Sequence, residues 1–287
     1  MTAGTRGAYR AYARLVLETM PEESRVGLTL GFVRTFGIPD IARVLAATGR
    51  MTNEPRGRAK ATGVAMFTLI GKGLDSEDGR RVVDGLRRVH DRPGITPELM
   101  HYVLACFTVC PLRFIDAHGH RAVTEAERDA AYLFHLSLAD ALGMPELSSL
   151  DGELAGEAAG GAIGGVAGGV VGGATGDAAG GATGDAAGGV AGAGADGLAG
   201  VERWMRDYET RHFAPTDAGR ALWAATSKGL LAARLPAPLA PLASVFAASL
   251  LDRPLREALT VRRPPAPVRA LVTYALRARA RARRRAA

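Results

Sequence analysis

Apolar residues recur at helical spacing along most of the chain. Between residues 82 and 90 the stripe consists of Val82, Val83, Leu86 and His90, which share one face of a helix. The same period predicts further helices over 8–20, 22–50, 56–72, 97–118, 124–143, 201–213, 216–234 and 241–251, with breaks at Pro21, Gly37 and Pro39. Ala, Leu and Arg are abundant and favour helix, so we expect an all-α fold with almost no sheet.

Capping residues mark where several of these helices begin and end. Thr96 is followed by Pro97, a pair typical of the N-cap and the first helical position. Thr124 and Glu127 have the spacing of a capping box, and Asp75 or Ser76 can cap the helix that ends at His90. The 97–118 helix is apolar nearly all round, so we expect it to be central.

Residues 155–200 differ in kind, because glycine and alanine dominate and the octapeptide GATGDAAG occurs twice in tandem, at 173–180 and 181–188. Glycine offers no side chain to bury, so we expect a disordered insert; a membrane helix over 158–176 is the alternative. The insert would interrupt one helical domain formed by residues 1–154 and 201–276, with a basic tail at 277–287.

The formal net charge is +7, yet six arginines between 277 and 285 account for nearly all of it. A run of like charges is usually a frayed, solvated end and less often a contact for anionic lipid or nucleic acid. Because the charge lies in a tail, a DNA-binding domain is not indicated, so we expect no nucleic-acid partner and allow a peripheral membrane contact. Cys106 and Cys110 are expected to be buried free thiols. The first residues lack an apolar core of signal-peptide type, which favours a cytoplasmic protein.

His90 occupies a position where the apolar stripe should continue, so its imidazole is expected to point inward. A lone histidine on an apolar face is more often a hydrogen-bonded core residue than a ligand. Imidazole is also the usual protein ligand of haem iron, and a helix end inside a helical core suits that role. The sequence contains no Cys-x-x-Cys-His motif, so any haem would be held noncovalently.

Arg58 and Thr62 lie four positions apart and share a helix face, whereas Lys60 should face away from them. In one interpretation Arg58 is solvated and Thr62 bonds to its own helix. In the other, the pair holds and polarises a small ligand such as dioxygen.

Other polar clusters give weaker indications. Asp116, His118 and His120 have the alternating spacing that suits metal ligands on a strand, but they lie at a glycine-containing turn. No other pattern of carboxylates and histidines in the sequence supplies the remaining ligands of a metal site. His101, His135 and His212 have no neighbours in the sequence that suggest chemistry. Nucleophile elbows, phosphate loops and dinucleotide fingerprints do not occur.

Several stretches, in order, resemble the MpaB and rubber oxygenase (latex-clearing protein) family. Beyond Arg58, Thr62 and His90, they are PELMHYVLACFTVCPLR from 97, GHRAVTEAE from 119, GMP from 143, MRDYE from 205, LDRPLR from 251, the proline pair at 264–265 and an arginine-rich last helix. The resemblance covers nearly the whole chain apart from the insert, and it rests on the order and spacing of these motifs.

The resemblance implies an all-helical domain that encloses a pocket for haem b and uses dioxygen to cleave carbon–carbon double bonds in isoprenoid or other apolar substrates. It implies that His90 is the proximal iron ligand and that Arg58 and Thr62 belong to the distal, catalytic side of the pocket. Rubber-cleaving members have a lysine directly before the matched threonine, where this chain has Ala61, which brings the chain nearer to the MpaB branch. Two alternatives remain: a non-enzymatic helical protein at a membrane surface, and a haem-binding member without activity.

Overall fold

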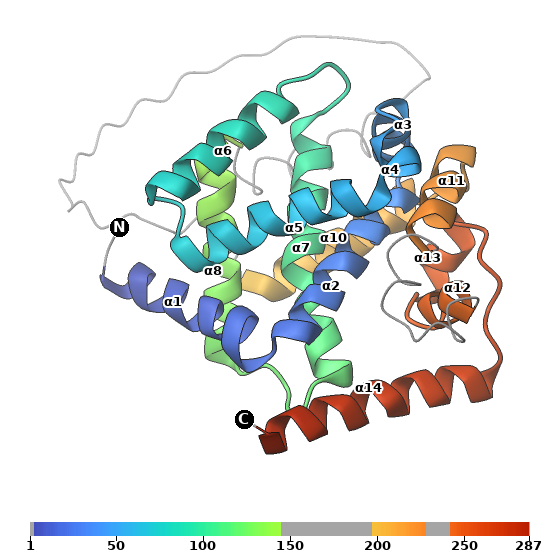
Figure 1. Ribbon diagram of the computed structural model, residues 1–287. Coiled ribbons are helices and arrows are strands. Elements are labelled where there is room, and N and C mark those ends of the chain that lie inside the picture. Colours follow the sequence, from blue (N-terminus) through green and yellow to red (C-terminus); the bar gives the residue numbers. More distant parts are fainter. Residues whose placement is uncertain (1–2, 145–196, 228–241, 287) are drawn as a thin grey trace, which may run out of the picture.

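The computed structural model describes residues 3–144, 197–227 and 242–286, and every regular element in these ranges is helical (Figure 1). The expected all-α fold is confirmed. Residues 155–196 of the glycine and alanine insert, the alternative membrane helix over 158–176 and the last residues of the 216–234 helix lie outside the described residues. Residues 197–200, which were expected to belong to the disordered insert, instead form the first turn of a helix.

The first part of the chain contains α1 (Ala3–Arg14), α2 (Pro21–Arg34), α3 (Pro39–Ala47), α4 (Arg50–Asn53), α5 (Pro55–Lys72), α6 (Glu77–His90), α7 (Pro97–His118) and α8 (Glu125–Ala141). The second part contains α10 (Gly197–His212), α11 (Asp217–Thr226), α12 (Ala243–Ala248), α13 (Arg253–Ala258) and α14 (Ala266–Ala286). The stretch 22–50 forms separate helices, because Pro39 restarts the chain after Gly37 and Gly49 adopts a left-handed conformation, with φ of 64°.

The capping residues act as the sequence predicts. The Ser76 hydroxyl accepts a hydrogen bond from the Gly79 amide at 2.9 Å, so Ser76 and not Asp75 is the N-cap of α6. The Thr96 hydroxyl accepts from the Leu99 amide, and Thr124 with Glu127 completes both halves of a capping box.

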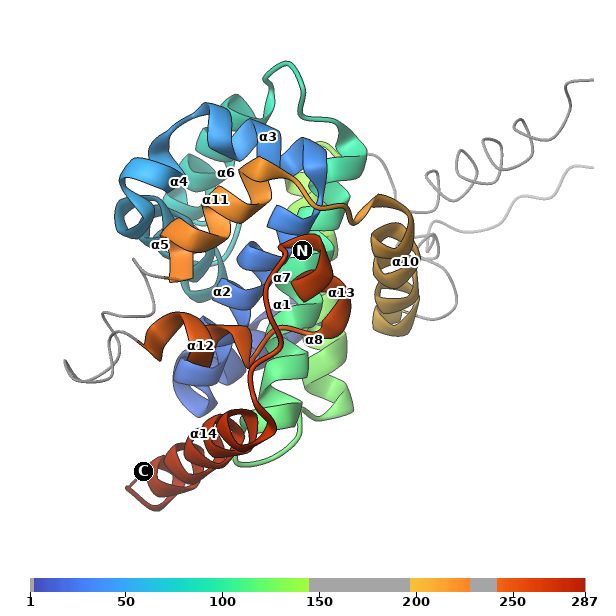
Figure 2. The ribbon, with the colours of Figure 1, turned by 90° about the vertical axis from the view of Figure 1, so that its right-hand side faces the viewer.

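The long helix α7 passes through the centre of the molecule and packs along α2 (Figures 1 and 2). Two glycines of α2 permit a close approach: a Cβ atom on Gly27 would lie 2.4 Å from the Pro111 Cα, and one on Gly31 would lie 2.6 Å from the Cys106 carbonyl oxygen. Among the described helices, α7 alone is long and apolar enough to cross a membrane, but 72% of its most apolar window is buried inside the protein. The expectation of a central helix is confirmed.

Apolar side chains pack in two clusters that meet along α7. The larger one joins α1, α2, α5, α7 and α8 with the C-terminal helices. The smaller one lies between the start of α3, one side of α7 and α10, and contains Ile38, Ile41, Leu99, Tyr102, Ala105, Cys106, Val109, Trp204, Met205 and Tyr208. Helix α10, which follows the insert, therefore completes a core begun by helices that precede it.

The expectation of a frayed arginine tail is wrong, because residues 277–286 continue α14, which lies across the lower end of the bundle (Figures 1 and 2). The Arg277 Nε donates a hydrogen bond to the Ala117 carbonyl at 2.9 Å, and Arg283 forms an ion pair with the buried carboxylate of Glu23. Ala280 is 1% exposed. One side of the arginine-rich helix is therefore packed against α2 and α7.

His135 on α8 gives the fold a pH dependence. Burial lowers the pKa of its imidazole to about 4 from the ordinary 6.5, although the ring Nδ1 donates to the Ala131 carbonyl at 2.8 Å. Below pH 6.5 the unfolded chain binds a proton at His135, whereas the folded protein keeps this imidazole neutral. The free energy of unfolding therefore falls as the pH falls toward 4.

We expect His135→Leu to remove this part of the pH dependence. Between about pH 7 and about pH 5, the free energy of unfolding of the original protein should decrease by about 2 kcal/mol more than that of the variant. Urea unfolding at the two pH values measures the difference. Equal decreases in both proteins would show that His135 is protonated in the folded state.

Candidate functional site

His90 is the last residue of α6, and the α5–α6 hairpin determines its place. The first turn of α6 sits tightly on the end of α5, because a Cβ atom on Gly79 would lie only 2.0 Å from the Gly73 carbonyl oxygen. Further along α6, Val83 is buried and Leu86 is half-buried against the larger apolar cluster, which also contains Met66 of α5. The stripe that ends at His90 therefore faces the core, as the sequence predicts.

The His90 side chain is half-buried, and its Nδ1 atom is shielded from solvent. The chain then turns through Gly94, whose φ is 89°, into the N-cap of α7. A Cβ atom on Gly94 would lie 3.8 Å from a methyl group of Val44 in α3. His90 thus ends α6. A short connection that passes beside α3 joins it to the central helix α7.

Thr62 is half-buried and lies on α5, the helix that pairs with α6, whereas Lys60 on α5 is exposed. Arg58 belongs to the same helix, one turn before Thr62, but its side chain lies outside the described part of the protein. All three predicted site residues therefore lie on the α5–α6 hairpin, and the structure describes the side chains of two of them, Thr62 and His90. Their roles toward a ligand stay predictions.

The Asp116, His118 and His120 turn connects α7 to α8 through ordinary hydrogen bonds. The Asp116 carboxylate accepts from the Val123 amide at 2.9 Å and from the Arg128 guanidinium at 2.6 Å. The His118 ring packs on Phe114, with centroids 4.6 Å apart, and burial with a smaller effect of Arg277 lowers its pKa. Within the described ranges, no group of three or more His, Cys, Asp or Glu side chains is arranged to hold a metal ion.

Cys106 and Cys110 are free thiols on α7, as expected; Cys106 is buried and Cys110 is half-buried. Burial raises the pKa of the Cys106 thiol, whereas a hydrogen bond from Cys106 lowers that of Cys110. A neutral, enclosed Cys106 behaves as a small apolar side chain of the core.

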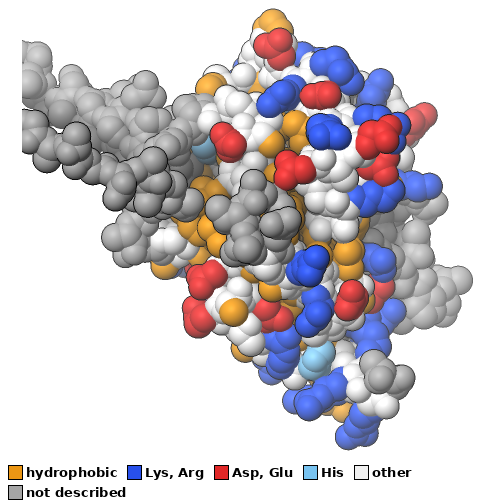
Figure 3. Space-filling view, turned by 90° about the vertical axis from the view of Figure 1, so that its left-hand side faces the viewer, with side chains coloured by type: hydrophobic (Ala, Val, Ile, Leu, Met, Phe, Trp, Pro, Cys, Tyr) orange, Lys and Arg blue, Asp and Glu red, His pale blue; other side chains and the backbone are white. Residues whose placement is uncertain are grey.

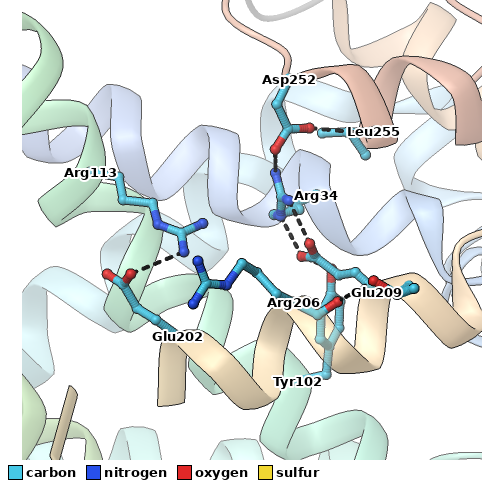
Figure 4. Close-up of polar contacts among 9 residues, drawn as sticks. Arg34, Tyr102, Arg113, Glu202, Arg206, Glu209, Asp252 and Leu255 are labelled. Atoms are coloured by element: carbon cyan, nitrogen blue, oxygen red, sulfur yellow. Dashed lines mark hydrogen bonds and ion pairs between the residues drawn. The ribbon is translucent and has the colours of Figure 1, made fainter. Parts of the chain in front are cut away.

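A buried polar network that the sequence did not predict joins α2, α7, α10 and the residue that precedes α13 (Figure 4). Arg34, at the end of α2, forms a bidentate ion pair with Glu209 of α10, and the distance from Arg34 Nη2 to Glu209 Oε2 is 2.6 Å. The same guanidinium reaches the Asp252 carboxylate at 2.7 Å, and the Tyr102 hydroxyl of α7 donates to Glu209 at 2.9 Å. These contacts join four segments that are distant in the sequence.

Burial by itself would lower the pKa of Arg34, but the hydrogen bonds and charge of Glu209, followed by the charge of Asp252, raise it well above its ordinary value. The side chains of Arg34 and Glu209 are only 10% and 6% exposed. Asp252 also caps α13, since its other carboxylate oxygen accepts from the Leu255 amide. The Arg34 and Glu209 charges are thus paired inside the protein, and the half-exposed Asp252 carboxylate closes the network at the surface. We call this network the clamp.

The sequence contains a signal for this clamp. Glu209 lies on the apolar face formed by Trp204, Met205 and Tyr208, where a carboxylate needs a buried partner. Arg34 sits within the apolar run that includes Phe32, Val33 and Phe36. Nothing in the spacing indicates that residues so far apart pair with each other.

We expect Glu209→Gln to lower the free energy of unfolding by about 3 to 5 kcal/mol, because it leaves the buried Arg34 guanidinium with only the half-exposed Asp252 carboxylate as counter-charge. Glu202→Gln is a matched control on the same helix, since its partner Arg113 is 35% exposed. The control should lose no more than about 1 kcal/mol. Thermal and urea unfolding of both variants measures the difference, and similar losses would contradict the interpretation of the clamp.

The chain resembles known proteins over most of its length. The family model described as "ER-bound oxygenase mpaB/B'/Rubber oxygenase, catalytic domain" matches residues 22–284. A protein from Penicillium brevicompactum named ER-bound oxygenase mpaB' is 25% identical over 239 residues, covering 80% of this chain and 48% of the relative. A protein from Penicillium roqueforti (strain FM164) named ER-bound oxygenase mpaB is 33% identical over 119 residues, 39% of each chain.

The matched segments thus span about half or less of each relative's own length. No solved structure matches the chain significantly. The family match includes Arg58, Thr62 and His90, the arginine clamp and nearly all of α14. With most of its residues covered by the family model, the chain belongs to the MpaB and rubber oxygenase catalytic-domain family.

Proposed function

We propose that this protein is a haem-dependent oxygenase that uses dioxygen to cleave a carbon–carbon double bond in an isoprenoid or other apolar substrate. Membership of an oxygenase family supports the reaction class. The position of His90, half-buried at the C-terminal end of α6 with a solvent-shielded Nδ1, is the observation that carries the cofactor proposal.

The residues around His90 are of the types that a haem site needs. An imidazole is the usual protein ligand of haem iron, and the hairpin supplies one from α6 and a hydroxyl, that of Thr62, from α5. Apolar side chains of the hairpin, such as Met66 and Leu86, suit the porphyrin edge. His90 would hold the iron of a noncovalent haem b, and the bound haem would supply the activation of dioxygen.

The protein residues have distinct roles in this proposal. Arg58 carries a permanent positive charge and would stabilise negative charge that develops on oxygen. Thr62 would donate a hydrogen bond to the same oxygen. The surrounding apolar side chains would exclude water and orient the substrate, since an apolar alkene offers few groups for polar recognition.

The absence of a lysine before Thr62 bears on the substrate. Ala61 is exposed and provides no charge at this position. We therefore propose that this protein acts in the manner of the MpaB branch, on an apolar small molecule and not on polyisoprene.

Free thiols at both cysteines are consistent with the cytoplasmic location that we propose for it.

The first test is the visible spectrum of the purified protein, oxidised and reduced, after addition of haemin. We expect a Soret band with a histidine-ligated iron signature that is shifted or lost in His90→Ala. His120→Ala is a matched control, because it removes an imidazole far along the chain from the α5–α6 hairpin. An unchanged spectrum in His90→Ala, or no Soret band in the original protein, would refute the haem proposal.

The second test concerns the distal residues. We expect Arg58→Ala to retain the Soret band and to decrease dioxygen consumption with an apolar alkene by about a hundredfold or more, because charge on oxygen loses its stabilising partner. Thr62→Val should act in the same direction, and Lys60→Ala, an exposed residue between them, should leave the rate within about twofold. Oxygen-electrode measurements compare the three variants. Equal rates in Arg58→Ala and Lys60→Ala would remove Arg58 from the proposed mechanism.

A further inference from the structure

The outward face of α14 combines arginines with two exposed large hydrophobic side chains, Leu271 and Tyr274. The helix contains seven arginines and no acidic residue. Its inner side is anchored by Ala280 and by the ion pair of Arg283 with Glu23, and the exposed Arg277 at the edge of this side donates a hydrogen bond to the Ala117 carbonyl. Helix α14 is therefore held on the bundle along one side, and its opposite side faces outward.

The outward side carries a stripe of five residues spaced three and four positions apart: Leu271, Tyr274, Ala278, Arg281 and Arg285. All five are exposed; Leu271 is 60% and Tyr274 is 71% exposed, the largest values among the large hydrophobic residues that the structure describes. We call this stripe the α14 outer face. An apolar and aromatic first half is thus followed by a cationic second half.

Arginine side chains gather around this second half. Arg277 and Arg284 are exposed and lie beside the outer face on the helix surface. Figure 3 shows the blue side chains that collect at the lower end of the molecule, where Figure 1 places the end of α14. A groove of about 400 Å³ between α2, α7 and α14 brings Arg279 and Arg283 to the same end.

We propose that the α14 outer face docks the protein onto an anionic lipid bilayer. Guanidinium groups bind lipid phosphates through two parallel hydrogen bonds, and basic residues near an anionic leaflet each strengthen binding by roughly fivefold. Tyrosine is enriched at the level of the lipid headgroups. An exposed leucine beside it stabilises binding when its side chain leaves water for the boundary between headgroups and acyl chains. Charge complementarity favours an anionic partner, and the exposed Leu271 and Tyr274 favour a bilayer over a nucleic acid.

The test is co-sedimentation of the full-length protein with vesicles of phosphatidylcholine alone, or of phosphatidylcholine with about a third phosphatidylserine. We expect binding to the anionic vesicles only, weakened by added salt. The double variant R281E/R285E should bind about tenfold more weakly or worse. The double variant L271S/Y274S should lose binding by several-fold, because it removes the side chains that enter the bilayer.

The matched control is R262E/R263E, which makes the same change in net charge at two exposed arginines that precede α14. This control should bind within about twofold of the original protein. Far-UV circular dichroism checks that each variant is folded. Hydrogen–deuterium exchange of the original protein, with and without anionic vesicles, gives a measurement that needs no variant and should show vesicle-dependent protection in α14.

Three results would overturn the proposal. Equal sedimentation with neutral and anionic vesicles would do so, and so would equal losses in R281E/R285E and the control. The third is unchanged vesicle binding in either of the two outer-face variants. Tight binding of a short DNA duplex, lost in R281E/R285E but kept in L271S/Y274S and without vesicle binding, would identify the face as a nucleic-acid surface instead.

Discussion

The buried ion pair between Arg34 and Glu209 constrains how helices from both parts of the chain pack against one another. It fixes the end of α2 to α10, and therefore joins the helices before the glycine and alanine insert to those after it. Tyr102 and Asp252 extend the same network to α7 and α13. Because two desolvated charges tolerate little change in geometry, the network specifies how these four segments meet more strictly than apolar packing alone would.

The central helix α7 connects this clamp to the candidate haem site. The short connection after His90 leads directly into the first turn of α7, and Tyr102 lies a little more than one turn further along. Leu99 and Tyr102 belong to the small apolar cluster that α10 completes. Tyr102 thus ties the Arg34 and Glu209 pair to the same helix that the connection after His90 enters.

The sequence predicted the helices well, because capping residues and apolar stripes act over only one or two helical turns. Caps at Ser76, Thr96 and Thr124 and the stripe of α6 depend on residues within one or two turns. The same period predicted that the Val83 and Leu86 side of α6 packs on the core. What the sequence could not show was which distant segments pair: the Arg34 and Glu209 contact depends on how α2 and α10 pack, and the anchoring of α14 depends on Glu23 and the Ala117 carbonyl.

The order of the helices along the chain has a consequence for synthesis on the ribosome. Helix α7 is complete at His118, but the Trp204, Met205 and Tyr208 side chains of α10 that cover one of its sides are made only after the whole insert. At a synthesis rate of about 5 to 20 residues per second, that side of α7 waits for several seconds without its cover. Among the described helices, α7 alone is long and apolar enough to cross a membrane, so its uncovered side is a place where a chaperone would bind the nascent chain during this interval.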